Sequence, residues 1–188
     1  AMIRLYALDG FNAFVIALGY KGEYIKRWLR DFGSREGHMT VKTNTGDVLT
    51  YEDNRPDWTV HLVETGMTTG TGGRIKRLKP WLGDGTFMLT WGDGLSDVNL
   101  QELYDFHKSH GKLATLTAAR PPARYGHIEF EGDLVKCFTE KPQTAEGWIN
   151  GAFFVLEPGI FDYIEGDTTQ WELEPMSGLA RDGQLMAY

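Results

Sequence analysis

A single carboxylate stands between two glycines where an apolar run ends. The stretch Thr90-Trp91-Gly92-Asp93-Gly94 continues the run TFML, which has the composition of a buried strand. In an open parallel sheet, ligands bind outside the carboxyl ends of the strands, and we expect Asp93 to lie one residue beyond such an end. The glycines on either side would let a ligand approach the backbone closely.

Two interpretations of Asp93 are open from these residues. A carboxylate at a strand end can hold Mg²⁺, which takes one or two protein carboxylates, several waters and the phosphate oxygens of a substrate. Alternatively, Asp93 belongs to a tight turn and caps the helix that follows. The stretch by itself favours neither interpretation.

A glycine-rich segment with three cations, TGTGGRIKR, covers residues 69–77. Free N–H groups at a helix N-terminus attract anions, and the Arg74 guanidinium would add a bidentate partner. The segment is not a Walker A loop, because the Gly-Lys-Ser/Thr element is missing. It is not the dinucleotide fingerprint either, because Ile75 stands where the third glycine is required. The alternative is a flexible turn with solvated cations.

Two further stretches contain polar residues next to apolar ones. Glu140 and Lys141 end a predicted hairpin strand, where adjacent side chains point to opposite faces. Glu140 suits sugar hydroxyls as an acceptor and Lys141 suits a phosphate as a point charge, although alone they would be two solvated charges. Asn150, in the apolar stretch INGAFF, needs a hydrogen-bond partner, either the backbone or a ligand hydroxyl.

Strands alternate with helices along most of the chain, and this pattern predicts the scaffold that positions these residues. It is typical of an α/β fold with a mainly parallel mixed sheet, helices on both of its faces and added β-hairpins. We expect one domain over residues 1–188, truncated at both ends. Strands are predicted near 13–18, 58–66, 86–92, 112–119 and 149–157, hairpins at 39–52 and 127–142, and a helix from 97 or 99 to Gly111.

Composition excludes several classes of partner. The net charge of −7 over 188 residues argues against a general nucleic-acid or membrane-surface binder, because both partners are polyanionic. A single nucleotide needs only a local cationic pocket. The one cysteine, Cys137, excludes an internal disulfide framework and suits the cytoplasm. Arg4 and Asp9 interrupt any apolar N-terminal segment, so we expect no signal peptide.

Seven motifs in order resemble the sugar-1-phosphate nucleotidyltransferases: GYKGEYI, TGTGGRIKR, WGDGLSD, RPPARYG, FTEKP, INGAFFVLEP and TTQWELEP. TGTGGR, RPPARYG and TTQWELEP point to the glucose-1-phosphate cytidylyltransferase branch. The resemblance covers almost the whole chain and implies a Rossmann-like nucleotidyltransferase fold in a homo-oligomer. It also implies that CTP and α-D-glucose 1-phosphate are joined, with Mg²⁺, into CDP-glucose and pyrophosphate for surface-polysaccharide (O-antigen) synthesis.

The same resemblance implies roles for individual residues. Asp93 matches the magnesium aspartate and, with Lys141, would be catalytic. The nucleotide would be contacted by Thr69, Arg74 and Gly92, and the sugar phosphate by Gly126, Glu140, Lys141 and Asn150. The family's glycine-rich N-terminal loop and second metal-binding aspartate are not in this sequence, and Ala152 stands where the family often has glycine.

The implied chemistry agrees with the residue types. A sugar phosphate is already an anion near neutral pH, so no general base is needed to make it a nucleophile. The difficulty is bringing it against another polyanion, which a metal ion and cationic side chains overcome. Two alternatives stay open: a transferase that uses dTTP, UTP or GTP, and a truncated, non-catalytic module that binds a nucleotide sugar.

Overall fold

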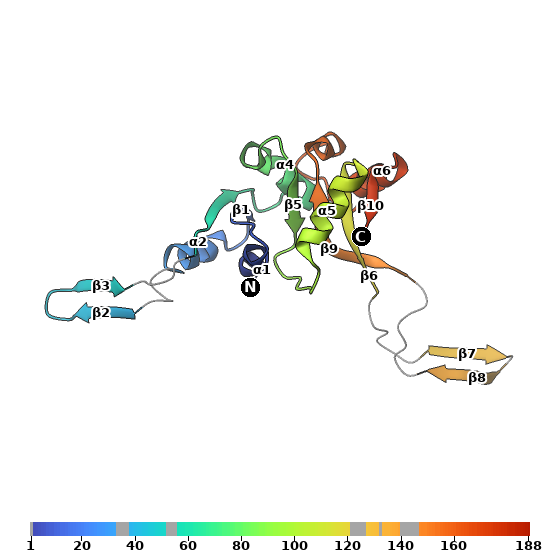
Figure 1. The fold of residues 1–188 in the computed structure, drawn as a ribbon, viewed down its shortest axis with the longest axis horizontal. Coiled ribbons are helices and arrows are strands. Elements are labelled where there is room, and N and C mark those ends of the chain that lie inside the picture. The colour runs from blue at the N-terminus through green and yellow to red at the C-terminus, as the bar shows by residue number, and fades with distance from the viewer. Residues whose placement is uncertain (1, 33–37, 52–55, 121–126, 132, 140–146) are drawn as a thin grey trace. The chain divides into compact units, whose positions relative to one another are not determined.

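A computed structural model describes residues 2–32, 38–51, 56–120, 127–131, 133–139 and 147–188 (Figure 1). Within these ranges, no helix is both long and apolar enough to cross a membrane. The elements in order are α1 Met2–Leu8, β1 Ala13–Leu18, α2 Gly22–Arg30, β2 His38–Lys42, β3 Asp47–Tyr51, β4 Thr59–Glu64, α4 Thr71–Leu82, β5 Phe87–Thr90, α5 Leu100–His110, β6 Ala114–Ala119, β7 His127–Glu131, β8 Leu134–Thr139, β9 Ile149–Leu156, the 3₁₀ helix Pro158–Tyr163, α6 Glu174–Arg181 and β10 Leu185–Ala187.

These elements group into two units, and each is described by itself. The first unit contains residues 1–84 and 161–175, and the second contains residues 85–160 and 176–188. The single domain expected over residues 1–188 therefore stays a prediction.

In the first unit, β1 and β4 lie side by side and run parallel. Ala13 is opposite Thr59 and Leu18 is opposite Glu64. Because a parallel pair needs a crossover, the chain between the two strands is long, and it includes α2 and the antiparallel hairpin of β2 and β3. Helix α4 packs against β1.

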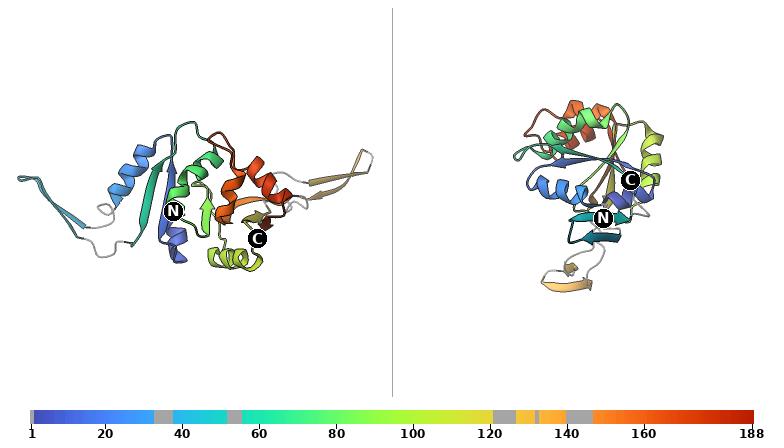
Figure 2. Two further views of the ribbon diagram at one scale, coloured as in Figure 1. Left: turned by 90° about the horizontal axis from the view of Figure 1, so that it is seen from above. Right: turned by 90° about the vertical axis from the view of Figure 1, so that its left-hand side faces the viewer.

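In the second unit, four strands form a sheet in the order β10-β6-β9-β5. Strand β10 is parallel to β6, whereas β6 and β5 are both antiparallel to β9. Three strands therefore share one direction and β9 alone runs against them, which confirms an α/β fold with a mixed sheet. Helix α5 packs against β6 and β9 (Figure 2).

The side chain of Asn99 caps the amino end of helix α5. The side-chain oxygen of Asn99 accepts the backbone N–H of Glu102 at 3.0 Å, and the Asn99 amide donates to the Glu102 carboxylate at 2.9 Å. This reciprocal cap places the N-cap at Asn99, not at Asp97. The helix ends at Gly111, whose φ of 67° is the left-handed conformation expected of a glycine there.

The glycines at the start of α4 allow a second chain segment to pass closely. A β-carbon on Gly70 would lie 2.5 Å from the backbone oxygen of Thr169, and one on Gly73 would collide with the backbone oxygen of Asp167. The neighbouring Trp171 is 1% exposed, so this crossing is part of the core. The glycines are thus explained by packing between segments about a hundred residues apart in the chain.

We expect Gly73→Ala to destabilise the fold. Alanine would favour a helix by about 1 kcal/mol, but the collision with Asp167 should lower the free energy of unfolding by about 1–3 kcal/mol. Urea unfolding measures the difference. The matched control is Gly166→Ala, because a β-carbon there meets no described atom within 4 Å. Equal stability of the two variants would contradict the packing account.

Candidate active site at the carboxyl edge of the sheet

The strand directions bring three predicted site residues to one end of the four-stranded sheet. Thr90 pairs with Phe153 and Ala118 pairs with Asn150, so the carboxyl ends of β5 and β6 lie beside the start of β9. We call this end the carboxyl edge. Gly92 and Asp93 follow β5 there, and Asn150 begins β9.

Asp93 lies three residues beyond its strand, not one. Strand β5 ends at Thr90, because Trp91 leaves the ladder and packs edge-on against Phe154, with ring centroids 5.2 Å apart. A β-carbon on Gly92 or Gly94 would meet no described atom within 4 Å. Packing within the described residues therefore does not explain these glycines, whereas the approach of a ligand would.

The Asp93 carboxylate is exposed and available. Within the described part of the chain it makes no hydrogen bond or ion pair, and helix α5 is capped by Asn99. The helix-capping interpretation of Asp93 is therefore wrong. Among the described residues no three His, Cys, Asp or Glu side chains lie close enough to hold a metal. A hard cation at Asp93 would take its other ligands from water and phosphate, which is the coordination that Mg²⁺ prefers.

The start of β9 is kinked at Asn150. The Asn150 side-chain oxygen accepts the N–H of Ala152 at 2.9 Å, and Ala152 has a φ of 68°, in the left-handed region that alanine rarely adopts. A β-carbon on Gly151 would lie 2.6 Å from the Thr117 hydroxyl, so glycine is required there. The backbone thus satisfies the Asn150 oxygen, and the amide nitrogen has no partner among the described residues.

In the first unit, Arg74 joins the carboxyl ends of β1 and β4. Its guanidinium donates to the Leu18 carbonyl at 3.1 Å and to the Thr65 hydroxyl at 2.7 Å. Thr65 is fully buried, and its hydroxyl in turn donates to the Leu18 carbonyl at 2.8 Å. A β-carbon at position 19 would lie 2.6 Å from the Arg74 guanidinium, so glycine there lets the guanidinium take this position. Sequence reasoning missed Thr65, whose only signal is its place after an apolar strand.

Thr69 lies in a turn that a second arginine, Arg77, holds in place through hydrogen bonds. The φ of Gly66 is 92°, and a β-carbon on it would lie 2.7 Å from the Thr69 hydroxyl and 3.1 Å from the Arg77 guanidinium. Arg77 donates to the Thr65 carbonyl at 3.1 Å and forms a bidentate pair with Asp167, at 2.8 and 2.5 Å. The hydrogen bonds from Arg77 lower the pKa of the Asp167 carboxyl.

The amino end of α4 is occupied by the chain itself. The backbone N–H groups of Gly70 and Gly73 donate to the carbonyls of Asp167 and Thr169, at 2.7 and 3.2 Å. Lys76 donates to the carbonyls of residues 164 and 165. All three cations of the TGTGGRIKR segment therefore have partners within the chain, although Lys76 and Arg77 are also exposed to solvent. Two of the amides that would serve an anion are also already bonded.

Three predicted residues of the sugar-phosphate site, Gly126, Glu140 and Lys141, lie outside the described residues. Their roles stay predictions.

Residues 28–179 match the model of a protein family described as nucleotidyl transferase. The chain belongs to this family. It is 39% identical over 188 residues to a glucose-1-phosphate cytidylyltransferase of Salmonella typhi, and 40% identical over 189 residues to a probable glucose-1-phosphate cytidylyltransferase of Bacillus subtilis (strain 168). Each alignment covers 100% of this chain and 73% of the relative.

Solved structures support the nucleotidyltransferase fold. The crystal structure of HddC from Yersinia pseudotuberculosis superposes with a TM-score of 0.66 at 21% identity, covering 100% of this chain and 74% of that one. A UDP-glucose pyrophosphorylase complexed with UDP-glucose superposes with a TM-score of 0.60 at 13% identity, covering 100% and 76%. At these identities the likeness shows the fold alone.

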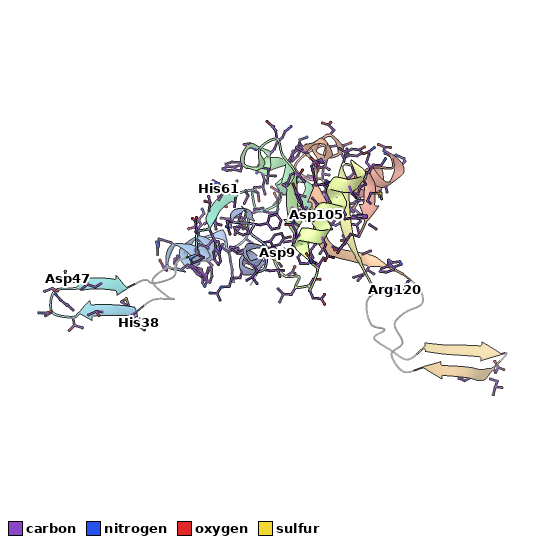
Figure 3. All side chains as sticks on the ribbon, viewed as in Figure 1. Asp9, His38, Asp47, His61, Asp105 and Arg120 are labelled. Atoms are coloured by element: carbon purple, nitrogen blue, oxygen red, sulfur yellow. The ribbon has the colours of Figure 1, made fainter. Side chains whose placement is uncertain are left out.

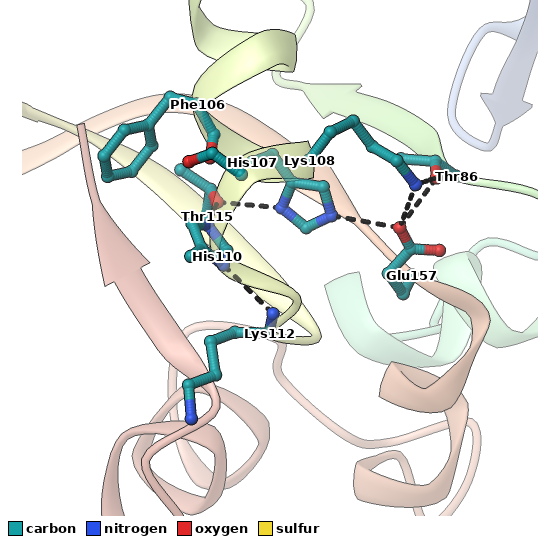
Figure 4. Close-up of polar contacts among 9 residues, drawn as sticks. Thr86, Phe106, His107, Lys108, His110, Lys112, Thr115 and Glu157 are labelled. Carbon is teal, nitrogen blue, oxygen red and sulfur yellow. Dashed lines mark hydrogen bonds and ion pairs between the residues drawn. The ribbon is translucent and has the colours of Figure 1, made fainter.

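At the opposite end of β9, this nucleotidyltransferase chain has a buried polar network (Figure 4). His107, 1% exposed, lies 2.8 Å from the Thr115 hydroxyl and 3.3 Å from the Glu157 carboxylate. His110 lies 2.8 Å from the same hydroxyl and accepts the N–H of Lys112. Both histidines therefore have partners within the chain.

One assignment of the donors satisfies every contact of this network with both histidines neutral. In it, His107 Nε2 carries the proton and donates to the ionised Glu157, and His107 Nδ1 accepts from the Thr115 hydroxyl. Because His110 Nδ1 accepts from Lys112, its Nε2 donates to Thr115. Burial accordingly lowers the pKa of His107 and of His110, and it outweighs the opposite effect of Glu157 on His107.

We expect acid to destabilise the fold through this network. The folded pKa of His107 is lowered, so the unfolded chain binds the proton more readily and stability falls as the pH drops through about 6.5. Burial raises the pKa of Glu157, but hydrogen bonds from Thr86, Lys108 and His107 lower it overall. Protonation of Glu157 therefore lowers the stability of the fold further at lower pH. The measurement is the thermal unfolding midpoint between pH 7.5 and 5.

His107→Gln is the test variant, because glutamine keeps hydrogen-bonding capacity without titrating. It should flatten the dependence of the midpoint on pH near 6.5. His61→Gln is the control, because His61 is exposed on β4. An unchanged pH dependence in His107→Gln would contradict the neutral-histidine arrangement.

Proposed function

We propose that this chain is the cytidylyltransferase part of an enzyme that makes CDP-glucose from CTP and α-D-glucose 1-phosphate. The observation that carries the proposal is the exposed Asp93 carboxylate at the carboxyl edge, which has no partner among the described residues. The identity of 39–40% with cytidylyltransferases over the whole chain supports the choice of nucleotide and sugar.

In the proposed reaction, a phosphate oxygen of glucose 1-phosphate forms a bond to the α-phosphorus of CTP. The bond from that phosphorus to the bridging oxygen breaks, and pyrophosphate leaves with the electron pair. The attacking oxygen is already ionised, so the reaction needs positioning and charge stabilisation, not a base.

The residues take separate parts in this proposal. Asp93 would hold Mg²⁺, which supplies charge neutralisation of the phosphates when bound. Thr69, Arg74 and Gly92 would contact the nucleotide; Arg74 keeps two of its three guanidinium nitrogens without a partner among the described residues. Gly126, Glu140, Lys141 and Asn150 would contact the sugar phosphate. The Asn150 amide nitrogen supplies a donor at the carboxyl edge.

The cellular setting belongs to the same proposal. A cytoplasmic location is supported by the single cysteine, Cys137. Assembly into a homo-oligomer and a role in surface-polysaccharide (O-antigen) synthesis rest on the resemblance to the family.

We expect Asp93→Asn to abolish most turnover while the fold is retained. Loss of one preorganised charge contact should slow pyrophosphate release by about 100-fold or more, and it should weaken Mg²⁺-dependent binding of CTP in calorimetry. Asp97→Asn is the matched control, because Asp97 is an exposed carboxylate in the same loop. If both variants release pyrophosphate at the rate of the unaltered chain, Asp93 has no role in metal binding.

We expect CTP to be the preferred nucleotide. Pyrophosphate release with glucose 1-phosphate is compared for CTP, UTP, dTTP and GTP at equal concentration. Faster release with UTP, dTTP or GTP would establish one of the alternative transferases instead. Heat of binding for CDP-glucose without turnover of any nucleotide would establish a non-catalytic module.

A further inference from the structure

An arginine and a tryptophan that no motif includes form a stacked pair at the carboxyl edge. The Arg120 guanidinium carbon lies 4.3 Å from the centroid of the Trp148 ring. Arg120 directly follows β6, as Figure 3 shows, and Trp148 directly precedes β9. The tryptophan is 62% exposed, so the ring covers no core.

The strand register places this pair on the same face as Asn150. Ala118 is opposite Asn150 and Ala119 is opposite Ile149, and continuing this register by one position sets Arg120 opposite Trp148, in agreement with their stacking. Because side chains alternate along a strand, we expect Trp148 and Asn150 to share one face of the sheet. A cation, an aromatic ring and an amide donor therefore lie together.

The Arg120 charge has no acidic partner in the described part of the chain, although the protein has 26 acidic residues against 19 basic ones. Stacking on an aromatic ring attracts the arginine to the ring face and orients its planar fork. Such a fork suits the bidentate binding of a phosphate. The pair thus presents an oriented cation without a protein anion to neutralise it.

The position of the pair relative to Asp93 suits a substrate that lies across the sheet edge. Strand β9 lies between β6 and β5, so these two strands are about 10 Å apart. Trp148 directly precedes β9, so stacking on it directs Arg120 from β6 toward β9 and the β5 side. A phosphate in front of the start of β9 would be within reach of long side chains from the ends of β5 and β6.

The kink in β9 shows that this end of the strand is held in a defined, costly conformation. The φ of Ala152 lies in the left-handed region, which residues other than glycine rarely adopt, and the contact of Gly151 with Thr117 leaves no room for a side chain. Strain of this kind concentrates at functional sites, where it fixes the direction of particular side chains. Here the side chains that directly precede the kink are those of Asn150 and Trp148.

We propose that Arg120, oriented by Trp148, binds the phosphate group of the sugar 1-phosphate. The inference rests on the proposed function and deepens it, because it names a residue that sets affinity for one of the two substrates. Arg120 contacts the substrate directly, whereas Trp148 is a positioning residue that acts through Arg120.

The test compares Arg120→Ala, Arg120→Lys and Trp148→Ala with the unaltered chain. Loss of a charge-assisted hydrogen bond should raise the KM for glucose 1-phosphate by about 10-fold or more in Arg120→Ala, with the KM for CTP unchanged. Arg120→Lys should recover part of the affinity, and Trp148→Ala should lose less than Arg120→Ala. The matched control is Arg181→Ala, because Arg181 is an exposed arginine of the same unit whose one ion pair among the described residues is with its neighbour Asp182.

Calorimetry with glucose 1-phosphate, and with glucose as the probe that lacks the phosphate, gives an independent readout. Arg120→Ala should weaken binding of glucose 1-phosphate by the same factor, and glucose should bind neither protein. If the unaltered chain turns over CTP while Arg120→Ala keeps its affinity for glucose 1-phosphate, the inference alone is overturned and the pair is a surface stack. An equal rise in both KM values also overturns it. If the unaltered chain neither binds glucose 1-phosphate nor turns over CTP, the proposed function fails and the inference with it.

Discussion

The second unit depends on one reversed strand, β9, whose carboxyl half is fully buried. Residues Phe153–Leu156 of β9 are 0–1% exposed, so both faces of the strand are covered and its register cannot slip. Asn150 stands at the start of β9 and Glu157 directly follows its end. Because β9 runs against β5 and β6, Asn150 joins the carboxyl ends of those strands, whereas Glu157 joins the histidine network at the other end.

This arrangement separates the groups that can meet a ligand from those that hold the fold. At the carboxyl edge, Asp93, Arg120 and the amide nitrogen of Asn150 have no polar partner among the described residues. In the buried network, every ring nitrogen of both histidines has a partner. A transferase that joins two anions needs polar and charged groups that are free to bind a ligand, and it needs a rigid scaffold to hold them in place. Strand β9 supplies that scaffold.

The positions of helices and strands could be predicted from the sequence more accurately than the contacts between segments that lie far apart in the chain. The apolar run at 13–18 became β1 with the same bounds, because its flanking polar residues and glycines end it locally. The direction of β9 was not predictable, since the apolar run INGAFFVL has no feature that reports direction. The TGTGG segment was interpreted as an anion site, but its glycines pack against residues 167–171, a contact far along the chain. The Arg120–Trp148 pair was missed because it depends on the register of two strands.

The central claim is that the carboxyl edge binds a metal–nucleotide through Asp93. The most direct measurement is a crystal structure of the chain with CDP-glucose and Mn²⁺ in place of Mg²⁺, with the manganese located by anomalous scattering. The account predicts an anomalous peak coordinated by the Asp93 carboxylate and by phosphate oxygens of the nucleotide sugar. A peak at another site, with the Asp93 carboxylate free in solvent, would contradict it.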